Sequence, residues 1–299
     1  MKSLEASSAT TEVYQGPKLR SYVELLKPRL SMLVAFSCAF GYGLAVRGDV
    51  NWITLTMLTL GGFLLSGASV CVNQIMEKDL DELMSRTKNR PLPSERLSTN
   101  EAMVFSLVCL LASVAILWIY TNPLTVILSI ISMILYAFVY TPLKRVGSIA
   151  VFVGAIPGAL PPLLGWIAAT NSITHEALII FGIQFIWQFP HFWAIAWVCD
   201  EDYKKAGFKL LPSGGGKDHN TAIQIAIYTL FLIPLGLLPM KFGVTGIDSA
   251  IVATVCGVAF LAATFSLMKT GSQKSAKTIM FGSFLYLPIV QIAYLLDKV

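Results

Sequence analysis

Long apolar stretches alternate with short polar connections along most of the chain. Each stretch is close to the roughly 20 residues that a helix needs to cross a bilayer. The nine stretches lie near residues 30–46, 53–75, 101–120, 124–142, 149–169, 175–198, 221–240, 247–268 and 278–296. Backbone groups in lipid have to pair within their own segment, so these stretches are predicted to be helices. The pattern therefore predicts an all-α, polytopic membrane protein with nine transmembrane helices.

The composition agrees with this class. Hydrophobic residues make up 55% of the chain and charged residues 13%, and the mean hydropathy of +0.69 excludes an ordinary soluble domain. Residues 1–15 are rich in Ser, Thr and Ala and are predicted to be a disordered tail, which leaves 16–299 as a single transmembrane domain. The five cysteines lack paired zinc-ligand spacing, so neither a disulfide framework nor a zinc site is expected.

The basic residues are distributed unevenly between the two sets of connections. Of the 22 Lys and Arg residues, all but Arg47, Lys241 and Lys298 fall in the N-terminal segment or in the connections after the second, fourth, sixth and eighth stretch. The positive-inside rule assigns that side, and with it the N-terminus, to the cytoplasm. The net charge of +5 then gives no indication of nucleic-acid binding. Because the first apolar stretch has full length and lacks a convincing cleavage site, we expect a protein of the bacterial cytoplasmic membrane.

A group of polar residues follows the second apolar stretch. Asn73, Glu77 and Asp81 are spaced four residues apart, so a helix would carry all three on one face. Amide and carboxylate oxygens are the ligands that Mg²⁺ prefers. Taken alone, the same residues fit a helix end whose acids are simply solvated.

A second acidic group follows the sixth stretch and includes Asp202. Two such groups at equivalent helix ends could face each other across one cavity and hold metal ions, or could be unrelated solvated loops. Upstream, Gln184, Gln188 and His191 fall close to the same helix face as Asp202. Polar residues inside a span favour a functional site, although they also form bonds between helices or with the carbonyl freed by Pro190.

Two basic connections lie on the same predicted side of the membrane. They contain Arg86, Arg90, Lys144 and Arg145. Guanidinium and ammonium groups suit a diphosphate, both when it binds and as charge develops on the departing oxygen. Juxtamembrane cations alone more often set topology or touch anionic lipid, so only their combination with the two acidic groups indicates a diphosphate site.

Together these motifs resemble those of the UbiA superfamily of intramembrane prenyltransferases. The resemblance runs from residue 26 to about 212 and rests on Leu26–Arg29, Asn73–Asp81, Met84–Pro91, Tyr140–Arg145, Gly158–Trp166, Pro190–Phe192, Glu201–Gly207 and Leu211–Pro212. Two positions depart from the family pattern: Glu77 stands where an Asp is usual, and Cys199 where the haem-modifying branch usually has Tyr. The Arg86-Thr87 and Arg90-Pro91 pairs, with His191, resemble the haem branch more than the quinone branch.

The resemblance implies a UbiA-like bundle and a Mg²⁺-dependent enzyme. It implies transfer of a farnesyl group from farnesyl diphosphate to a vinyl group of haem B, with addition of water, to give haem O, and a haem A synthase as a downstream partner. The implied metal ligands are Asn73, Glu77, Asp81 and Asp202, and the implied diphosphate ligands are Arg86, Arg90, Lys144 and Arg145. His191 would ligate or orient the haem, or help to deliver the added water.

Two alternative functions stay open at this point. A UbiA-type enzyme that prenylates an aromatic acid for quinone synthesis would share the metal motifs and differ in its acceptor. A transporter would also have many spans with Pro-Gly interruptions and buried polar groups. The clustering of acids at one membrane face argues against the transporter.

Overall fold

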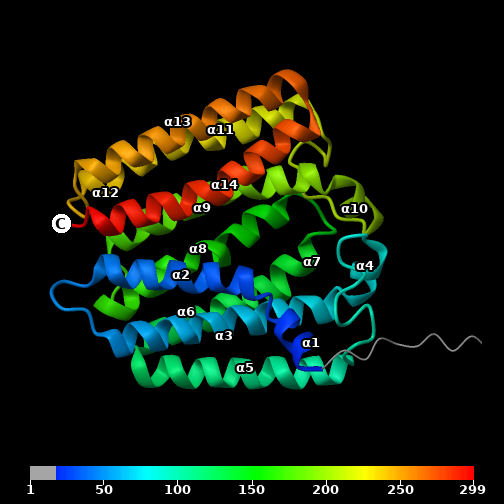
Figure 1. The fold of residues 1–299 in the computed structure, drawn as a ribbon, viewed down its shortest axis with the longest axis horizontal. Coiled ribbons are helices and arrows are strands. Elements are labelled where there is room, and N and C mark those ends of the chain that lie inside the picture. The colour runs from blue at the N-terminus through cyan, green and yellow to red at the C-terminus, as the bar shows by residue number, and fades with distance from the viewer. Residues whose placement is uncertain (1–17) are drawn as a thin grey trace, which may run out of the picture.

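Long helices lying side by side make up the structure, a computed structural model that describes residues 18–299 (Figure 1). The predicted tail, 1–15, lies outside the described residues. The long helices are α2 (Pro28–Ala45), α3 (Trp52–Met76), α5 (Thr99–Tyr120), α6 (Pro123–Ile134), α8 (Ile149–Thr170), α9 (His175–Val198), α11 (His219–Gly236), α13 (Ile247–Thr270) and α14 (Gln273–Leu296). Short helices are α1 (Lys18–Leu25), α4 (Lys78–Leu83), α7 (Thr141–Leu143), α10 (Asp200–Lys205) and α12 (Leu238–Lys241), and a π-helix η1 (Leu135–Tyr140) joins α6 to α7.

The predicted class of an all-α, multi-pass membrane protein is confirmed. Eight helices of the described chain are long and apolar enough to cross a membrane, and they correspond to the predicted stretches from 53–75 onward. The first predicted stretch, 30–46, is the helix α2 and packs along α3 and α8, but it is not among those eight. A ninth span and a cytoplasmic N-terminus therefore stay predictions.

Polar residues in the connections mark where several of the long helices begin. At each of these positions the side-chain oxygen accepts a hydrogen bond from the backbone amide three residues on, which satisfies one of the unpaired N–H groups of a helix start. The residues that cap helices in this way are Asn51, Ser98, Asn122, Thr174, Asp218 and Ser272.

Two of the polar residues predicted on one face of α9 form hydrogen bonds to the neighbouring helix α8, which contains several prolines. Pro162 lies inside α8 and cannot donate to the carbonyl of Gly158; Gln184 Nε2 donates to that carbonyl instead, at 2.8 Å. Gln188 Nε2 donates to a second α8 carbonyl, that of Ala155, at 2.8 Å. The two glutamines therefore form hydrogen bonds between helices, which was the alternative to a functional site. Their acceptors are carbonyls of α8 and not the carbonyl freed by Pro190.

Small residues let α2 and α8 approach until their backbones touch. A Cβ atom at Gly165 would overlap the carbonyl oxygen of Cys38, and one at Gly41 would overlap the carbonyl of Pro162. This contact holds the second half of α2 against α8.

We predict that Gly165→Ala lowers the stability of the protein by roughly 1–3 kcal/mol, since one methyl group would force the α2 and α8 backbones apart. The matched control is Gly182→Ala in α9, where a Cβ would meet nothing within 4 Å. Thermal unfolding in detergent measures both variants. Equal unfolding temperatures for the two would contradict the close contact between α2 and α8.

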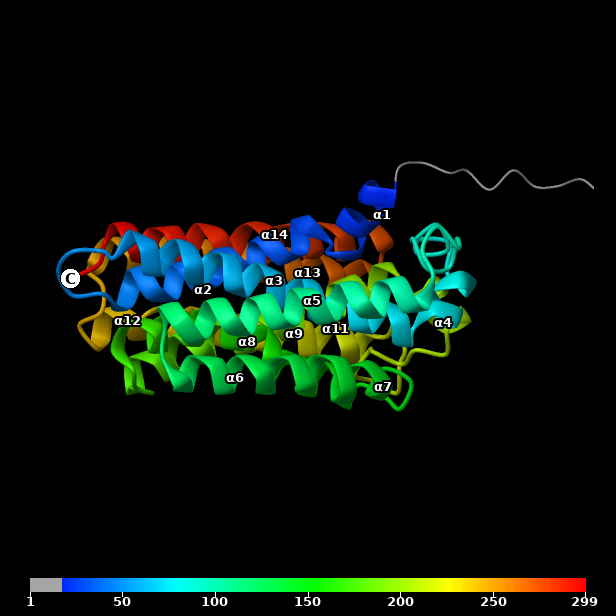
Figure 2. The same cartoon turned by 90° about the horizontal axis from the view of Figure 1, so that it is seen from below.

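The polar connections that carry the predicted site gather at one end of the bundle. Helices α4 and α10 lie together at that end, and the C-terminus lies at the other (Figure 1). Seen from below, α4 and α7 again lie at the end away from the C-terminus (Figure 2). Residues that are far apart in the sequence can therefore meet in one place.

Candidate active site

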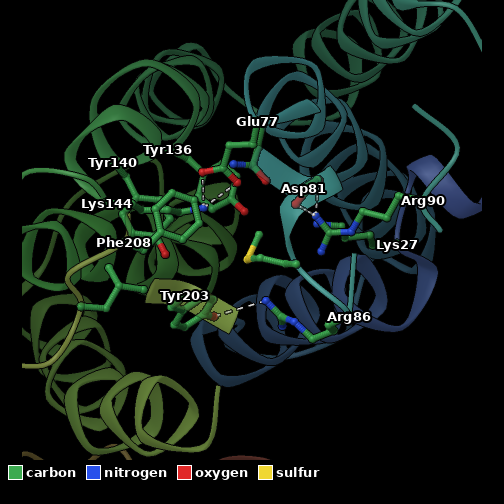
Figure 3. A pocket seen from close by; sticks show the side chains of 13 residues that line it. Lys27, Glu77, Asp81, Arg86, Arg90, Tyr136, Tyr140, Lys144, Tyr203 and Phe208 are labelled. Carbon is green, nitrogen blue, oxygen red and sulfur yellow. Dashed lines mark hydrogen bonds and ion pairs between the residues drawn. The ribbon is translucent and has the colours of Figure 1, made fainter. Parts of the chain in front are cut away.

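A charged pocket of about 130 Å³ lies at this end of the bundle (Figure 3). Its walls come from the residue before α2, the end of α3, α4, the connection after α4, η1, the residue after α7, α10 and the segment after α10. The lining residues are Lys27, Asn73, Glu77, Asp81, Met84, Arg86, Arg90, Tyr136, Tyr140, Lys144, Tyr203, Phe208 and Leu210. Six of the predicted site residues are among them.

The first predicted motif is divided between two helices and still lines one pocket. Helix α3 ends at Met76, Glu77 leaves helical geometry at φ −103° and ψ 11°, and α4 begins at the next residue. The amide of Glu77 nevertheless donates to the Asn73 carbonyl at 3.0 Å, and that of Asp81 to the Glu77 carbonyl at 2.7 Å. Because this four-residue spacing of hydrogen bonds continues through the break, the three side chains stay on one face.

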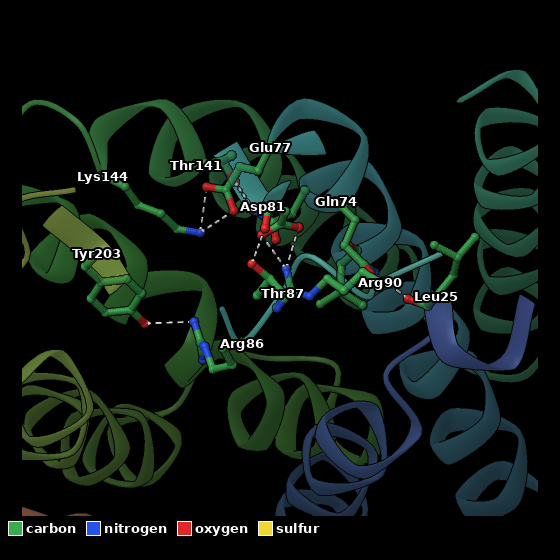
Figure 4. Close-up of polar contacts among 12 residues, drawn as sticks. Leu25, Gln74, Glu77, Asp81, Arg86, Thr87, Arg90, Thr141, Lys144 and Tyr203 are labelled. Atoms are coloured by element: carbon green, nitrogen blue, oxygen red, sulfur yellow. Dashed lines mark hydrogen bonds and ion pairs between the residues drawn. The ribbon is translucent and has the colours of Figure 1, made fainter. Parts of the chain in front are cut away.

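Asp81 is fully buried and paired with Arg90. Arg90 Nη1 lies 2.8 Å from Asp81 Oδ1 and 2.6 Å from Oδ2. The hydroxyl of Thr87 donates to the backbone carbonyl of Asp81 at 2.7 Å, which folds the connection after α4 back over the motif (Figure 4).

Glu77 is buried and paired with Lys144, which follows α7. Lys144 Nζ lies 2.9 Å from one carboxylate oxygen of Glu77 and 3.1 Å from the other. The same ammonium group lies over the rings of Tyr140, at 4.9 Å from its centroid, and Phe208, at 5.6 Å. Aromatic faces at this distance attract a cation, so the position of Lys144 is fixed from several sides.

The side chain of Asn73 is oriented by Thr141 of α7. Its Nδ2 donates to the hydroxyl of Thr141 at 3.1 Å. Among the described residues, none donates a hydrogen bond to its side-chain oxygen at hydrogen-bond distance. That oxygen is the atom that Asn73 can offer to a ligand.

Asp202 lies beside the pocket and shapes the segment that carries Arg86. Its carboxylate accepts hydrogen bonds from the backbone amides of Ser85 and Arg86, each at 3.2 Å. The ammonium group of Lys205 lies 3.0 Å away; this contact, with the two amides, lowers the pKa of Asp202 to about 2. The Arg86 guanidinium lies over the ring of Tyr203, 5.4 Å from its centroid.

The oxygen donors of the pocket fit a Mg²⁺ ion. In the part of the chain that the structure describes, no three His, Cys, Asp or Glu residues lie close enough together to form a metal site of their own. The pocket brings together two carboxylates, of Glu77 and Asp81, and the amide of Asn73. Mg²⁺ is typically held by one or two carboxylates and completes its shell with water and substrate phosphate, which is what this donor set allows.

Two predicted residues lie away from the pocket lining. Arg145 is exposed at the surface after α7. His191 is buried between α9 and α14, where its Nδ1 lies 2.8 Å from the hydroxyl of Ser283 and its ring stacks on Trp187 at 4.4 Å. Neither residue lines the charged pocket.

Several lining residues were missed by the sequence analysis. Tyr136, Tyr140 and Lys144 are spaced four residues apart, the same signal that identified Asn73 to Asp81, and it could have found both tyrosines. Lys27 lies in the Leu26–Arg29 motif, for which no ligand role was predicted from the sequence. It has left-handed backbone geometry, with φ 45°, just before Pro28.

Lys27 differs from the other cations of the pocket. Among the described residues it has no carboxylate within ion-pair distance, whereas Arg90 and Lys144 each hold one. Burial, and then the nearby charges of Arg90 and Lys144, lower the pKa of Lys27 to about 7. A cation in this environment favours an anionic ligand.

Comparison with known proteins extends this picture. The model of the UbiA prenyltransferase family matches residues 34–287. A protoheme IX farnesyltransferase of Cytophaga hutchinsonii is 51% identical over 282 residues, which cover 94% of this chain and 99% of that protein. One of Flavobacterium psychrophilum is 47% identical over 285 residues, covering 93% of this chain and 94% of its own.

Solved structures share the fold. A digeranylgeranylglyceryl phosphate synthase has a TM-score of 0.77 at 20% identity and covers 94% of this chain and 99% of its own. A UbiA homolog from Archaeoglobus fulgidus, bound to DMAPP and Mg²⁺, has a TM-score of 0.66 at 17% identity and covers 92% of this chain and 99% of its own. At these identities the likeness concerns the fold alone.

We predict that binding of magnesium pyrophosphate at pH 8 takes up a proton at Lys27. The pKa of about 7 leaves the amine mostly neutral at pH 8, and a bound anion favours its charged form, so up to about one proton enters the site. Calorimetry in two buffers with different ionisation enthalpies measures the uptake. The uptake should be lost in Lys27→Met and kept in Lys88→Met, an exposed lysine of the connection after α4; equal uptake in both variants would contradict the assignment.

Proposed function

The chain belongs to the UbiA prenyltransferase family, and within that family we propose that it transfers a farnesyl group from farnesyl diphosphate to a vinyl group of haem B, giving haem O. The relatives named protoheme IX farnesyltransferase, which match this chain over nearly its whole length, support haem as the acceptor. The observation that carries the chemistry is the pocket in which buried carboxylates and cations converge at one end of an apolar bundle.

The reaction breaks the bond between C1 of the farnesyl group and the diphosphate oxygen, and both electrons leave with the diphosphate. The terminal carbon of the haem vinyl group then attacks C1 of the resulting allylic cation. The cation that forms next to the porphyrin ring is captured by water, which loses a proton and leaves a hydroxyl group. Each step needs the site to control charge and exclude competing water.

The donor set of the pocket supports a metal-dependent ionisation. Asn73, Glu77 and Asp81 would hold Mg²⁺, and Asp202 stays a predicted fourth ligand at the edge of the pocket. Mg²⁺ bound there would neutralise the diphosphate and make it a better leaving group. Structures of the same fold that are bound to Mg²⁺ and a prenyl diphosphate support this part of the proposal.

The cations of the pocket would bind the diphosphate oxygens. Lys27, Arg86, Arg90 and Lys144 line the cavity, and charge-assisted hydrogen bonds from such groups strengthen as negative charge develops on the departing oxygen. Arg145 stays a predicted ligand from its exposed position. The rings of Tyr136, Tyr140, Tyr203 and Phe208 offer aromatic faces that stabilise an allylic cation.

His191 would act on the haem rather than on the diphosphate. It is buried among aromatic side chains, forms a hydrogen bond with Ser283 and does not line the charged pocket. If its Nε2 ligates haem iron, His191→Ala shifts the absorption spectrum of bound haem. If its role is structural, the same substitution reduces the yield of folded protein.

The proposal also covers the cellular location of the enzyme and its downstream partner. The charged pocket would open to the cytoplasm of a bacterial cell, because the positive-inside rule assigns that side to the connections that line it. Haem O would pass to a haem A synthase acting downstream. Membership of a prenyltransferase family argues against a transporter. The names of the relatives favour haem over a quinone precursor as the acceptor.

We expect Asp81→Asn to reduce farnesyl transfer roughly 100-fold or more, because it removes a charged metal ligand and leaves Arg90 unpaired. The assay incubates purified protein with haem B, farnesyl diphosphate and Mg²⁺, with or without chelator, and detects farnesylated haem by mass spectrometry. Asp79→Asn is the control, since Asp79 is exposed two residues away. Wild-type activity in Asp81→Asn, or product formation with chelator present, would overturn the metal assignment.

A further inference from the structure

Each carboxylate of the proposed metal site is already paired with a cation. Each oxygen of Glu77 lies within hydrogen-bond distance of Lys144 Nζ, at 2.9 and 3.1 Å. Each oxygen of Asp81 lies within hydrogen-bond distance of Arg90 Nη1, at 2.8 and 2.6 Å. The two acids are 4% and 0% exposed, so these ion pairs lie away from bulk water.

The carboxylates and the cations of the site therefore each oppose binding of the ligand that the other group would attract. A metal ion that binds these carboxylates competes with Lys144 for Glu77 and with Arg90 for Asp81. The charges of the same two cations are compensated by the carboxylates, which weakens their attraction for a diphosphate. Neither ligand can bind fully unless the existing pairs open.

Opening a pair for one ligand alone is unfavourable. A metal ion without diphosphate would leave the ammonium and guanidinium groups without a counter-charge in a buried site, and a diphosphate without metal would leave two bare carboxylates. An unpaired buried charge is strongly destabilising. When both ligands enter together, every charge keeps an opposite partner.

We propose that the metal and the diphosphate bind to this pocket only as a pair, through an exchange of ion-pair partners. The carboxylates of Glu77 and Asp81 pass from Lys144 and Arg90 to the metal, while Lys144 and Arg90 pass to the diphosphate oxygens. This inference rests on the proposed function, whose substrate carries the diphosphate. Because binding free energies are linked, each ligand raises the affinity for the other by the same factor.

The exchange also accounts for release after the reaction. Once the farnesyl group has been transferred, the diphosphate and metal can leave together while the original ion pairs form again. The empty pocket then has little affinity for free metal or for a lone anion. Lys27 lines the same pocket and has no carboxylate within ion-pair distance among the described residues, so it can contact an incoming diphosphate before either ion pair opens.

The test measures binding of Mn²⁺, a paramagnetic probe for the Mg²⁺ site, to purified protein in detergent by electron paramagnetic resonance. Wild-type protein should bind Mn²⁺ weakly alone and at least ~10-fold more tightly with inorganic pyrophosphate. Lys144→Gln frees Glu77, so it should raise the affinity for Mn²⁺ alone by about 10-fold. Arg86→Gln is the matched control: it removes a cation from the same pocket without releasing a carboxylate, because Arg86 contacts Tyr203, and should change that affinity less than ~3-fold.

Arg90→Gln repeats the test at the other pair, so the inference stays testable if Lys144→Gln fails to fold in a thermal-unfolding check. An equal gain of Mn²⁺ affinity in the Arg86 and Lys144 variants would show that only the total pocket charge matters. Wild-type protein that binds Mn²⁺ as tightly alone as with pyrophosphate would also overturn the exchange. The same wild-type preparation is assayed for farnesylated haem: product without coupled binding refutes the exchange alone, and absence of product refutes the proposed function.

Discussion

Charge buried at the end of an apolar bundle has to stay compensated, and this requirement organises the site. Glu77 and Asp81 lie out of bulk water, where an unpaired carboxylate would be strongly unfavourable. Lys144 and Arg90 supply the compensation from two other segments of the chain. The ion pairs thus join α3 and α4 to the connections after α4 and α7, and they hold in one place the charges that a metal and a diphosphate need.

The surrounding structure serves to fix these charged groups. The break at Glu77 lets α4 turn while the four-residue spacing of the motif is kept. Asp202 binds the backbone that carries Arg86, and Thr141 orients Asn73. Farther down the bundle, Gln184 replaces the hydrogen bond that Pro162 cannot make. These polar groups therefore either position the site or satisfy backbone groups of the helices that support it.

The sequence predicted the apolar helices and most of the charged pocket, because hydropathy and four-residue spacing are local signals. It could not predict which acid pairs with which cation, since Glu77 and Lys144 are 67 residues apart and meet only after folding. The same limit applies to Lys27, which joins the other cations of the pocket only after folding. Asp202 and His191 shared a predicted face of one helix, but a break after Val198 starts a new helix at Asp200, and only Asp202 lies beside the charged pocket.

A structure of the protein with Mg²⁺ and a non-hydrolysable thio-analogue of farnesyl diphosphate tests the exchange of ion-pair partners most directly. If the ion pairs exchange partners, metal density lies against Asn73, Glu77 and Asp81, and Lys144 and Arg90 have moved from the carboxylates to the diphosphate oxygens. Ion pairs that remain as they are in the empty pocket, with the diphosphate bound elsewhere, would contradict the exchange.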